Sequence, residues 1–288
     1  MAELPLTILD EPQLDTPRLV LSFSGWMDGG DVSTGVADLL TGHGPMTPLA
    51  EIAPDPFYIY NFPASMEIAA IFRPHGKIEQ GVLRDFRPPE NRFLHHPGHR
   101  LILLKGQEPH MHWQTYADCV FEVATRFGVR EIFFAGSVGG VVPHTREPRL
   151  FTSVSDEAMK PAFEDRGLRF TDYEGPVSLV SYMMTRAAEH HCRMAAIVAE
   201  IPAYVQGRNP KSLCPVITAL ASILGFAIDV EPVRAGIPEW EKRLSEVIED
   251  RPDLVKHIRK LETDYDNEVF EEMGDLKDWL ESQGIRVD

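Results

Sequence analysis

The chain has 288 residues, 43% of them hydrophobic, which is enough to bury the core of one large domain or of one domain with an appendage. Its 44 acidic and 28 basic residues give a formal net charge of −16 at pH 7. Nucleic-acid binders neutralise phosphates with clustered lysines and arginines, so this charge argues against a nucleic-acid partner and also disfavours anionic membrane surfaces.

The sequence also argues against secretion and membrane insertion. No window approaches the roughly 18 consecutive apolar residues that a membrane span requires. Met1–Pro5 lacks the basic region and the apolar core of a signal peptide. The three cysteines, Cys119, Cys192 and Cys214, are isolated and odd in number, which favours buried free thiols over disulfides. We therefore expect a cytoplasmic protein with no membrane partner.

The first predicted strand, Leu19–Ser24, breaks into the glycine-rich turn Gly25-Trp26-Met27-Asp28-Gly29-Gly30 and precedes a predicted helix over Val32–Leu40. Open α/β sheets build their sites at such turns, at the carboxyl ends of strands. The segment lacks the Gly-x-x-x-x-Gly-Lys-Ser/Thr string of a phosphate loop, and Asp28 brings negative charge to the position that a phosphate would take. The turn therefore indicates an architecture more strongly than a chemistry.

Strand-like and helix-like segments alternate over the next two hundred residues. The further predicted strands are Leu49–Ala53, Phe57–Asn61, Leu101–Lys105, Glu131–Ala135, Phe151–Val154 and Met194–Glu200, and the further predicted helices are Trp113–Phe127, Ser178–His190 and Ser212–Phe226. Several strands are continuous apolar runs, which are typical of strands covered on both faces. Lys77 to Phe93 breaks the alternation and predicts an irregular hairpin or excursion. The pattern predicts an α/β fold with a mixed, mostly parallel sheet flanked by helices.

The character of the chain changes after Ala235-Gly236. One predicted helix carries the apolar stripe of Trp240, Leu244, Val247 and Ile248, and a second begins at Pro252. Leu276, Trp279 and Leu280 predict a short last helix. We therefore divide the chain into an α/β core (1–235) and an acidic helical appendage (236–288). The appendage is either a helical hairpin packed on the core or an arm for oligomerisation or partner docking.

Four motifs, in this order and spacing, resemble the proteasome assembly chaperone 2 family in its actinobacterial branch. They are Gly25-Trp26-Met27-Asp28, then Gly106-Gln107-Glu108-Pro109 with Trp113, then Gly136 with Gly139-Gly140, and finally Glu200-Ile-Pro-Ala-Tyr204 followed by Gly225. The resemblance covers about residues 18 to 230. It implies a phosphorylase/hydrolase-like fold and protein-interaction work in proteasome assembly. We expect no cofactor and a homo-oligomer, either a dimer or a trimer.

The end of the chain departs from this family. Relatives that dock on proteasomes can end in a hydrophobic residue, a tyrosine and one further residue. This chain ends Ile285-Arg286-Val287-Asp288. We therefore do not expect its tail to insert into a proteasome pocket.

Several polar and small residues fall where predicted strands end, as the lining of a ligand crevice would. The catalytic candidates are Asp28, Glu108 and Glu200, and the candidate ligand contacts are Gly25, Trp26, Asp28, Gly136, Ser137 and Arg146. Glu108 and Glu200 can serve as general acid and base if burial raises their pKa values. In the alternative interpretation, each of them caps a helix or bonds backbone amides in a turn.

Two further motifs are weaker. Ala135-Gly-Ser-Val-Gly139 nearly matches the Gly-x-Ser-x-Gly elbow of serine hydrolases, but the residues after Ser137 do not read as the helix that an elbow needs. The histidines at 95, 96, 99, 110 and 112 lack a His-Glu-x-x-His string and a cysteine pair. We therefore expect solvated loop histidines and no metal site.

Two hypotheses follow from these residues. The first is a non-enzymatic protein that binds partner subunits as assembly chaperones do. The second is a hydrolase-like or phosphorylase-like enzyme acting on a small nucleoside-like or phosphorylated substrate near Asp28, Glu108 and Glu200. An enzyme predicts that Glu108 and Glu200 face each other in a closed pocket, whereas an interaction protein predicts carboxylates bonded to backbone amides and a large apolar surface.

Overall fold

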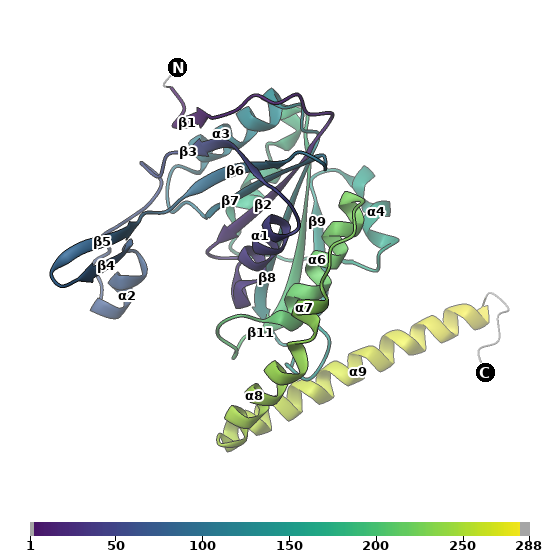
Figure 1. The fold of residues 1–288 in the computed structure, drawn as a ribbon. Helices are drawn as coiled ribbons and strands as arrows, with labels where there is room; N and C mark the ends of the chain where they lie inside the picture. The colour runs from purple at the N-terminus through teal and green to yellow at the C-terminus, as the bar shows by residue number, and fades with distance from the viewer. Residues whose placement is uncertain (1–2, 283–288) are drawn as a thin grey trace.

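A nine-stranded sheet forms the centre of the computed structural model, which describes residues 3–282, with side chains up to residue 268 (Figure 1). In spatial order the strands are β1 (Leu6–Ile8), β3 (Thr47–Ile52), β6 (Asn91–His96), β7 (Leu101–Gln107), β2 (Arg18–Ser24), β8 (Glu131–Gly140), β11 (Arg193–Pro202), β9 (Leu150–Val154) and β10 (Arg169–Phe170). The central strands β7, β2, β8 and β11 run parallel, and antiparallel strands flank them on both sides. The predicted mixed sheet is therefore confirmed.

Helices cover both faces of the sheet, because the central strands are apolar on both sides. Leu19 and Leu21 point into one core with α3 (Trp113–Arg126) and α5 (Leu179–Met184). Val20 points the other way, into a second core with α1 (Val32–Gly42), α4 (Lys160–Glu164) and α6 (Pro210–Leu224). The three cysteines are buried free thiols, as expected. None of the helices in the described part of the chain is both long and apolar enough to cross a bilayer.

Some predicted elements were wrong. Phe57–Asn61 is a loop, because Phe57 plugs the core beside the Tyr116 ring, at 5.1 Å, while its carbonyl accepts the amides of His110 and Met111. The predicted helix over Ser178–His190 is α5 followed by the 3-10 turn η3 (Ala187–His190). Here the Thr185 and Arg186 amides bond three residues back, which closes the first helix.

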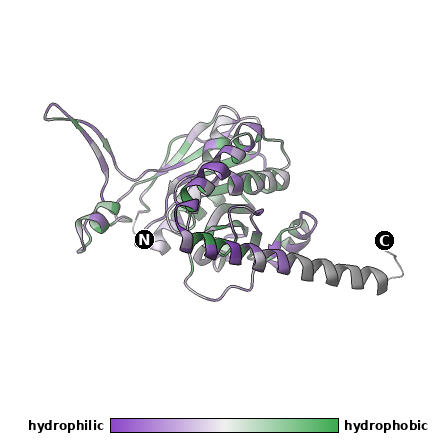
Figure 2. Ribbon diagram, turned by 90° about the horizontal axis from the view of Figure 1, so that it is seen from below, coloured by the Kyte–Doolittle hydropathy of each residue, from purple (hydrophilic) through white to green (hydrophobic). Residues whose placement is uncertain are grey.

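Residues 62–87 leave the body of the protein, and we call them the hairpin arm. They comprise α2 (Met66–Ile71) and the two-stranded sheet of β4 (His75–Glu79) and β5 (Val82–Arg87). Figure 1 shows the arm projecting from the sheet, and Figure 2 shows it standing clear of the body in a second view. The predicted hairpin is confirmed in kind, but Asn91–His96 returns to the main sheet as β6.

The described part of the chain ends with the helices α7 (Glu231–Arg234), α8 (Ile237–Glu249) and α9 (Pro252–Ser282), of which α7 belongs to the predicted core (1–235) and the other two to the predicted appendage. The short last helix predicted at Leu276–Leu280 is part of the continuous helix α9. The helix α8 packs against both α6 and α9. Residues 283–288, on which the prediction about the chain end depends, lie outside the described residues.

Candidate functional site

Seven of the eight candidate residues lie at or near the carboxyl ends of the central strands, in three separate groups, whereas Arg146 lies in the connection between β8 and β9. In the first group, Glu108 follows β7, and its carboxylate accepts the backbone amides of Trp26 and Leu179, both at 3.0 Å. It thus joins the turn after β2 to the start of α5. Gly25 has a φ of +139°, and a Cβ there would lie 3.0 Å from the Cβ of Glu108. Glu108 therefore holds two segments of backbone in place.

The second group joins the turn after β2 to β8. The Asp28 carboxylate accepts the Thr34 amide at 3.0 Å and the Thr34 hydroxyl at 2.9 Å, at the start of α1. Burial raises the pKa of Asp28 above its ordinary value, although the bonds from Thr34 oppose the shift.

Ser137 belongs to the same group. It is fully buried, and its hydroxyl donates to the carbonyl of Gly29. The strand β8 continues through Gly140 after this serine, so a strand stands where a nucleophile elbow needs a helix. The neighbouring Gly136 lies against the Met27 carbonyl and the Phe134 ring, where a Cβ does not fit.

The third group surrounds Glu200, near the end of β11. Its carboxylate accepts the Val141 amide at 2.6 Å and pairs with the Arg149 guanidinium at 3.1 Å. Arg149 also pairs with Glu268 of α9. Because Glu200 and Arg149 are both buried, this pair fixes the end of β11 against the strand β9 and the last helix.

The structure brings two of the candidate residues, Trp26 and Glu200, to one cleft of about 590 Å³. Other parts of its wall are Val138–Gly140, Tyr173 and Val177. Trp26 is 66% exposed beside it. Most of the residues that line the cleft are apolar. Among the catalytic candidates predicted from the sequence, Glu200 is the one that lines it.

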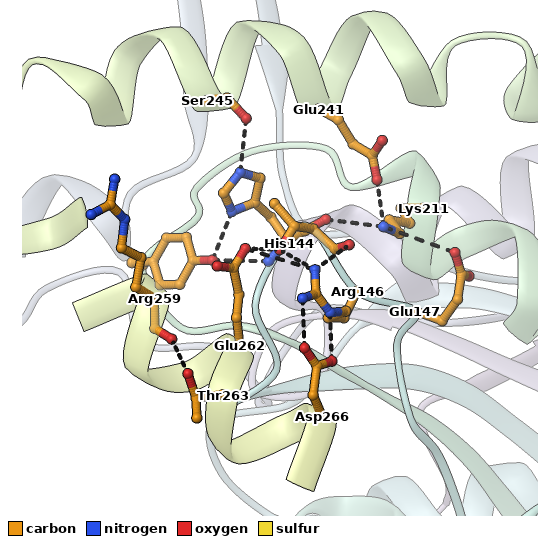
Figure 3. Close-up of polar contacts among 12 residues, drawn as sticks. His144, Arg146, Glu147, Lys211, Glu241, Ser245, Arg259, Glu262, Thr263 and Asp266 are labelled. Atoms are coloured by element: carbon orange, nitrogen blue, oxygen red, sulfur yellow. Dashed lines mark hydrogen bonds and ion pairs between the residues drawn. The ribbon is translucent and has the colours of Figure 1, made fainter. Parts of the chain in front are cut away.

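A polar network that the sequence did not reveal lies beside these groups and connects the core to α8 and α9 (Figure 3). His144 is buried, and its ring nitrogens lie 2.9 Å from the Tyr204 hydroxyl and 3.1 Å from the Ser245 hydroxyl of α8. Lys211 of α6 donates to the His144 carbonyl at 3.1 Å and pairs with Glu241 of α8. Burial lowers the pKa of His144. The neutral His144 ring therefore connects the core to α8 through its two hydrogen bonds.

Arg146 belongs to this network. Its guanidinium donates to both carboxylate oxygens of Asp266 on α9, at 2.7 and 2.8 Å. The Thr145 hydroxyl donates to Glu262, one turn earlier on the same helix. The signal in the sequence was the i, i+4 spacing of Glu262 and Asp266, but nothing in the sequence identified their basic partner across more than a hundred residues.

The histidines at 95 and 96 correct a prediction. They lie in β6 rather than in a solvated loop, and both are buried. The alternation of Asn91, Phe93 and His95 on one face carries His95 into the core. His96 points to the opposite face, where its ring lies 4.4 Å from that of His99. Among the residues that the structure describes, no three His, Cys, Asp or Glu side chains gather closely enough to hold a metal ion.

The chain matches a known protein family in sequence and solved structures in fold. The model of the PAC2 family matches residues 22–248. No curated protein matches the chain in sequence.

Several solved structures share the fold. Rv2714 of Mycobacterium tuberculosis, a protein of unknown function, is 20% identical, with a TM-score of 0.79 over 93% of this chain and 91% of that one. The proteasome-assembly chaperone homologue Rv2125 of the same organism is 24% identical, with a TM-score of 0.71 over 84% and 99%. PbaB of Pyrococcus furiosus, an archaeal proteasome activator, is 18% identical, with a TM-score of 0.63 over 86% and 99%.

Proposed function

The chain belongs to the PAC2 family, and from that premise we propose that it acts by binding other protein chains, as an assembly chaperone does. The proposed partner is a proteasome-related subunit, because proteins of similar fold include a proteasome-assembly chaperone homologue and a proteasome activator. The proposal includes self-association as a dimer or a trimer. It also includes a cytoplasmic location, which the three free buried thiols support.

The hairpin arm is the observation that carries the proposal. Its large apolar side chains are between 42% and 86% exposed: Phe62, Met66, Ile68, Ile71, Ile78, Val82, Leu83 and Phe86. At roughly 100 Å² each, they offer about 800 Å², which is what one partner buries in an interface of standard size. A two-stranded hairpin is only marginally stable by itself. The arm thus has the size and the chemistry of a docking surface.

The charge of the arm supports the same conclusion. Residues 62–87 contain three acidic and four basic residues, whereas the whole chain carries −16. The arm can therefore approach an acidic partner, including a second copy of this chain, without the repulsion that the rest of the surface would cause.

The carboxylates at the strand ends also support the proposal, because each of them is bonded to other groups of the protein. Glu108 and Asp28 bond backbone amides, and Glu200 bonds an amide and an arginine. This is the arrangement that the interaction hypothesis predicts. The enzyme hypothesis keeps one supporting observation, the cleft beside Trp26 and Glu200.

The test compares two charged variants at exposed apolar sites. In the arm, Ile78→Glu with Leu83→Glu places charges within the proposed surface, and Val247→Glu on α8 is the control, since Val247 is 61% exposed. Affinity capture of proteasome subunits, with light-scattering mass, should show loss of the complex for the arm variant only. Equal capture by both variants, or a wild-type protein that captures no proteasome subunit, would overturn the proposal.

A further inference from the structure

A second cavity lies at the amino ends of the four central strands, at the end of the sheet opposite to the candidate residues. Arg18 begins β2 and Arg193 begins β11, while Arg100 and Arg130 directly precede β7 and β8. An arginine therefore lies at the amino end of each of the four parallel strands. Together with Glu131, His99 and Phe226, these side chains line a cavity of about 470 Å³, which we call the arginine pocket.

The arginine pocket has more positive charge than its own carboxylate neutralises. Glu131 pairs with Arg18 at 3.0 Å and with Arg193 at 2.9 Å. Arg18 also donates to the Leu224 carbonyl, so its role is to hold the end of α6. The remaining guanidiniums have weaker protein partners: Arg130 bonds the His191 carbonyl at 3.4 Å, and Arg100 pairs with Asp15 at 3.7 Å.

Four guanidiniums thus lie around Glu131, the carboxylate that lines the cavity, and the resulting excess of positive charge favours the binding of a further anion. This local excess of positive charge contrasts with the net charge of −16 of the whole chain. The planar fork of arginine matches phosphate and carboxylate oxygens in pairs. The cavity volume lies within the range of small-molecule sites.

One wall of the arginine pocket is aromatic. The rings of His99 and Phe226, which both line the cavity, stack with centroids 5.0 Å apart. The His43 ring packs behind them, 5.5 Å from Phe226 and 5.6 Å from His99. This wall offers a flat surface next to the guanidiniums, so a planar ring attached to an anionic group fits it.

We propose that the arginine pocket binds a small anion with at least two negative charges, held by Arg100, Arg130 and the free donors of Arg193. The shared chemistry is a cluster of phosphate or carboxylate oxygens. The site lies at the amino ends of the strands, away from the candidate residues at the carboxyl ends, and does not depend on the proposed protein partner.

The test is titration calorimetry of the full chain with three probes: inorganic pyrophosphate, ATP and citrate. Binding should weaken as salt is added. Pyrophosphate tighter than citrate identifies phosphate as the source, and the reverse identifies carboxylate. ATP tighter than pyrophosphate, with the difference lost in Phe226→Leu, shows that the aromatic wall takes part.

The double variant Arg100→Gln with Arg130→Gln should weaken binding about tenfold or more, because charge-assisted hydrogen bonds are lost. Its control is Arg243→Gln on α8, whose exposed side chain pairs with Glu239. Thermal unfolding verifies that both variants fold. Absence of binding by all three probes, or equal affinity in the double variant and the control, would overturn the inference.

Discussion

At the scale of single residues, the candidate carboxylates are explained by what they hold. Glu108 fixes two backbone amides, whereas Glu200 fixes one and also neutralises a buried arginine. The sequence predicted that both glutamates fall at strand ends, but it could not identify their partners. Trp26 and Leu179 lie 82 and 71 residues from Glu108 along the chain, and only the folded sheet brings them together.

Glu200→Gln separates a structural from a catalytic role. The substitution leaves buried Arg149 with its one exposed partner, Glu268, so the free energy of unfolding should fall by about 2–4 kcal/mol. Glu268→Gln is the matched control and should cost about 0.5 kcal/mol or less, because Glu268 is exposed. Urea denaturation measures both. A Glu200→Gln protein as stable as the parent contradicts the structural role.

At the scale of elements, hydropathy predicted the central strands because they are continuous apolar runs buried on both faces. The same logic failed at Phe57–Asn61, where an apolar run plugs the core as a loop. It also missed β6, whose buried face includes Asn91 and His95. Buried polar residues are invisible to hydropathy. The burial of Asn91, for example, depends on a bond that only the folded chain forms, from the Tyr58 hydroxyl to its side-chain oxygen at 2.8 Å.

The attachment of α8 to the core should depend on pH through His144. The groups that face this ring are Tyr204, Ser245, Lys211, Glu241 and Glu262. Burial lowers the pKa of folded His144, so the unfolded chain takes up the proton more readily. Its contribution is therefore fully present above the unfolded value of about 6.5 and is lost as pH falls through the folded value.

Hydrogen exchange of α8, corrected for intrinsic rates, measures this dependence between about pH 7.5 and about pH 5.5. Protection should fall towards the acidic end in the parent protein and change less in His144→Gln. The Arg146–Asp266 pair provides an internal reference, because Arg146 lowers the pKa of Asp266 and the pair stays charged throughout this window. An identical pH slope in parent and variant contradicts the role of His144.

At the scale of the whole molecule, charge and apolar surface are unevenly distributed. Residues 236–288 contain 16 acidic and 8 basic residues, whereas the hairpin arm has a slight positive excess and the arginine pocket a strong one. Such segregation orients an approaching partner and makes association sensitive to salt. Composition gave only the total, because neither the projection of the arm nor the convergence of four arginines can be read along the chain.

The most direct test of the account is hydrogen exchange of the purified protein alone and in complex with captured proteasome subunits. The account predicts new protection concentrated in residues 62–87, because the hairpin arm is the surface that a partner covers. Unchanged exchange in the arm, with protection instead around Trp26 and residues 173–178 of the cleft, would contradict it.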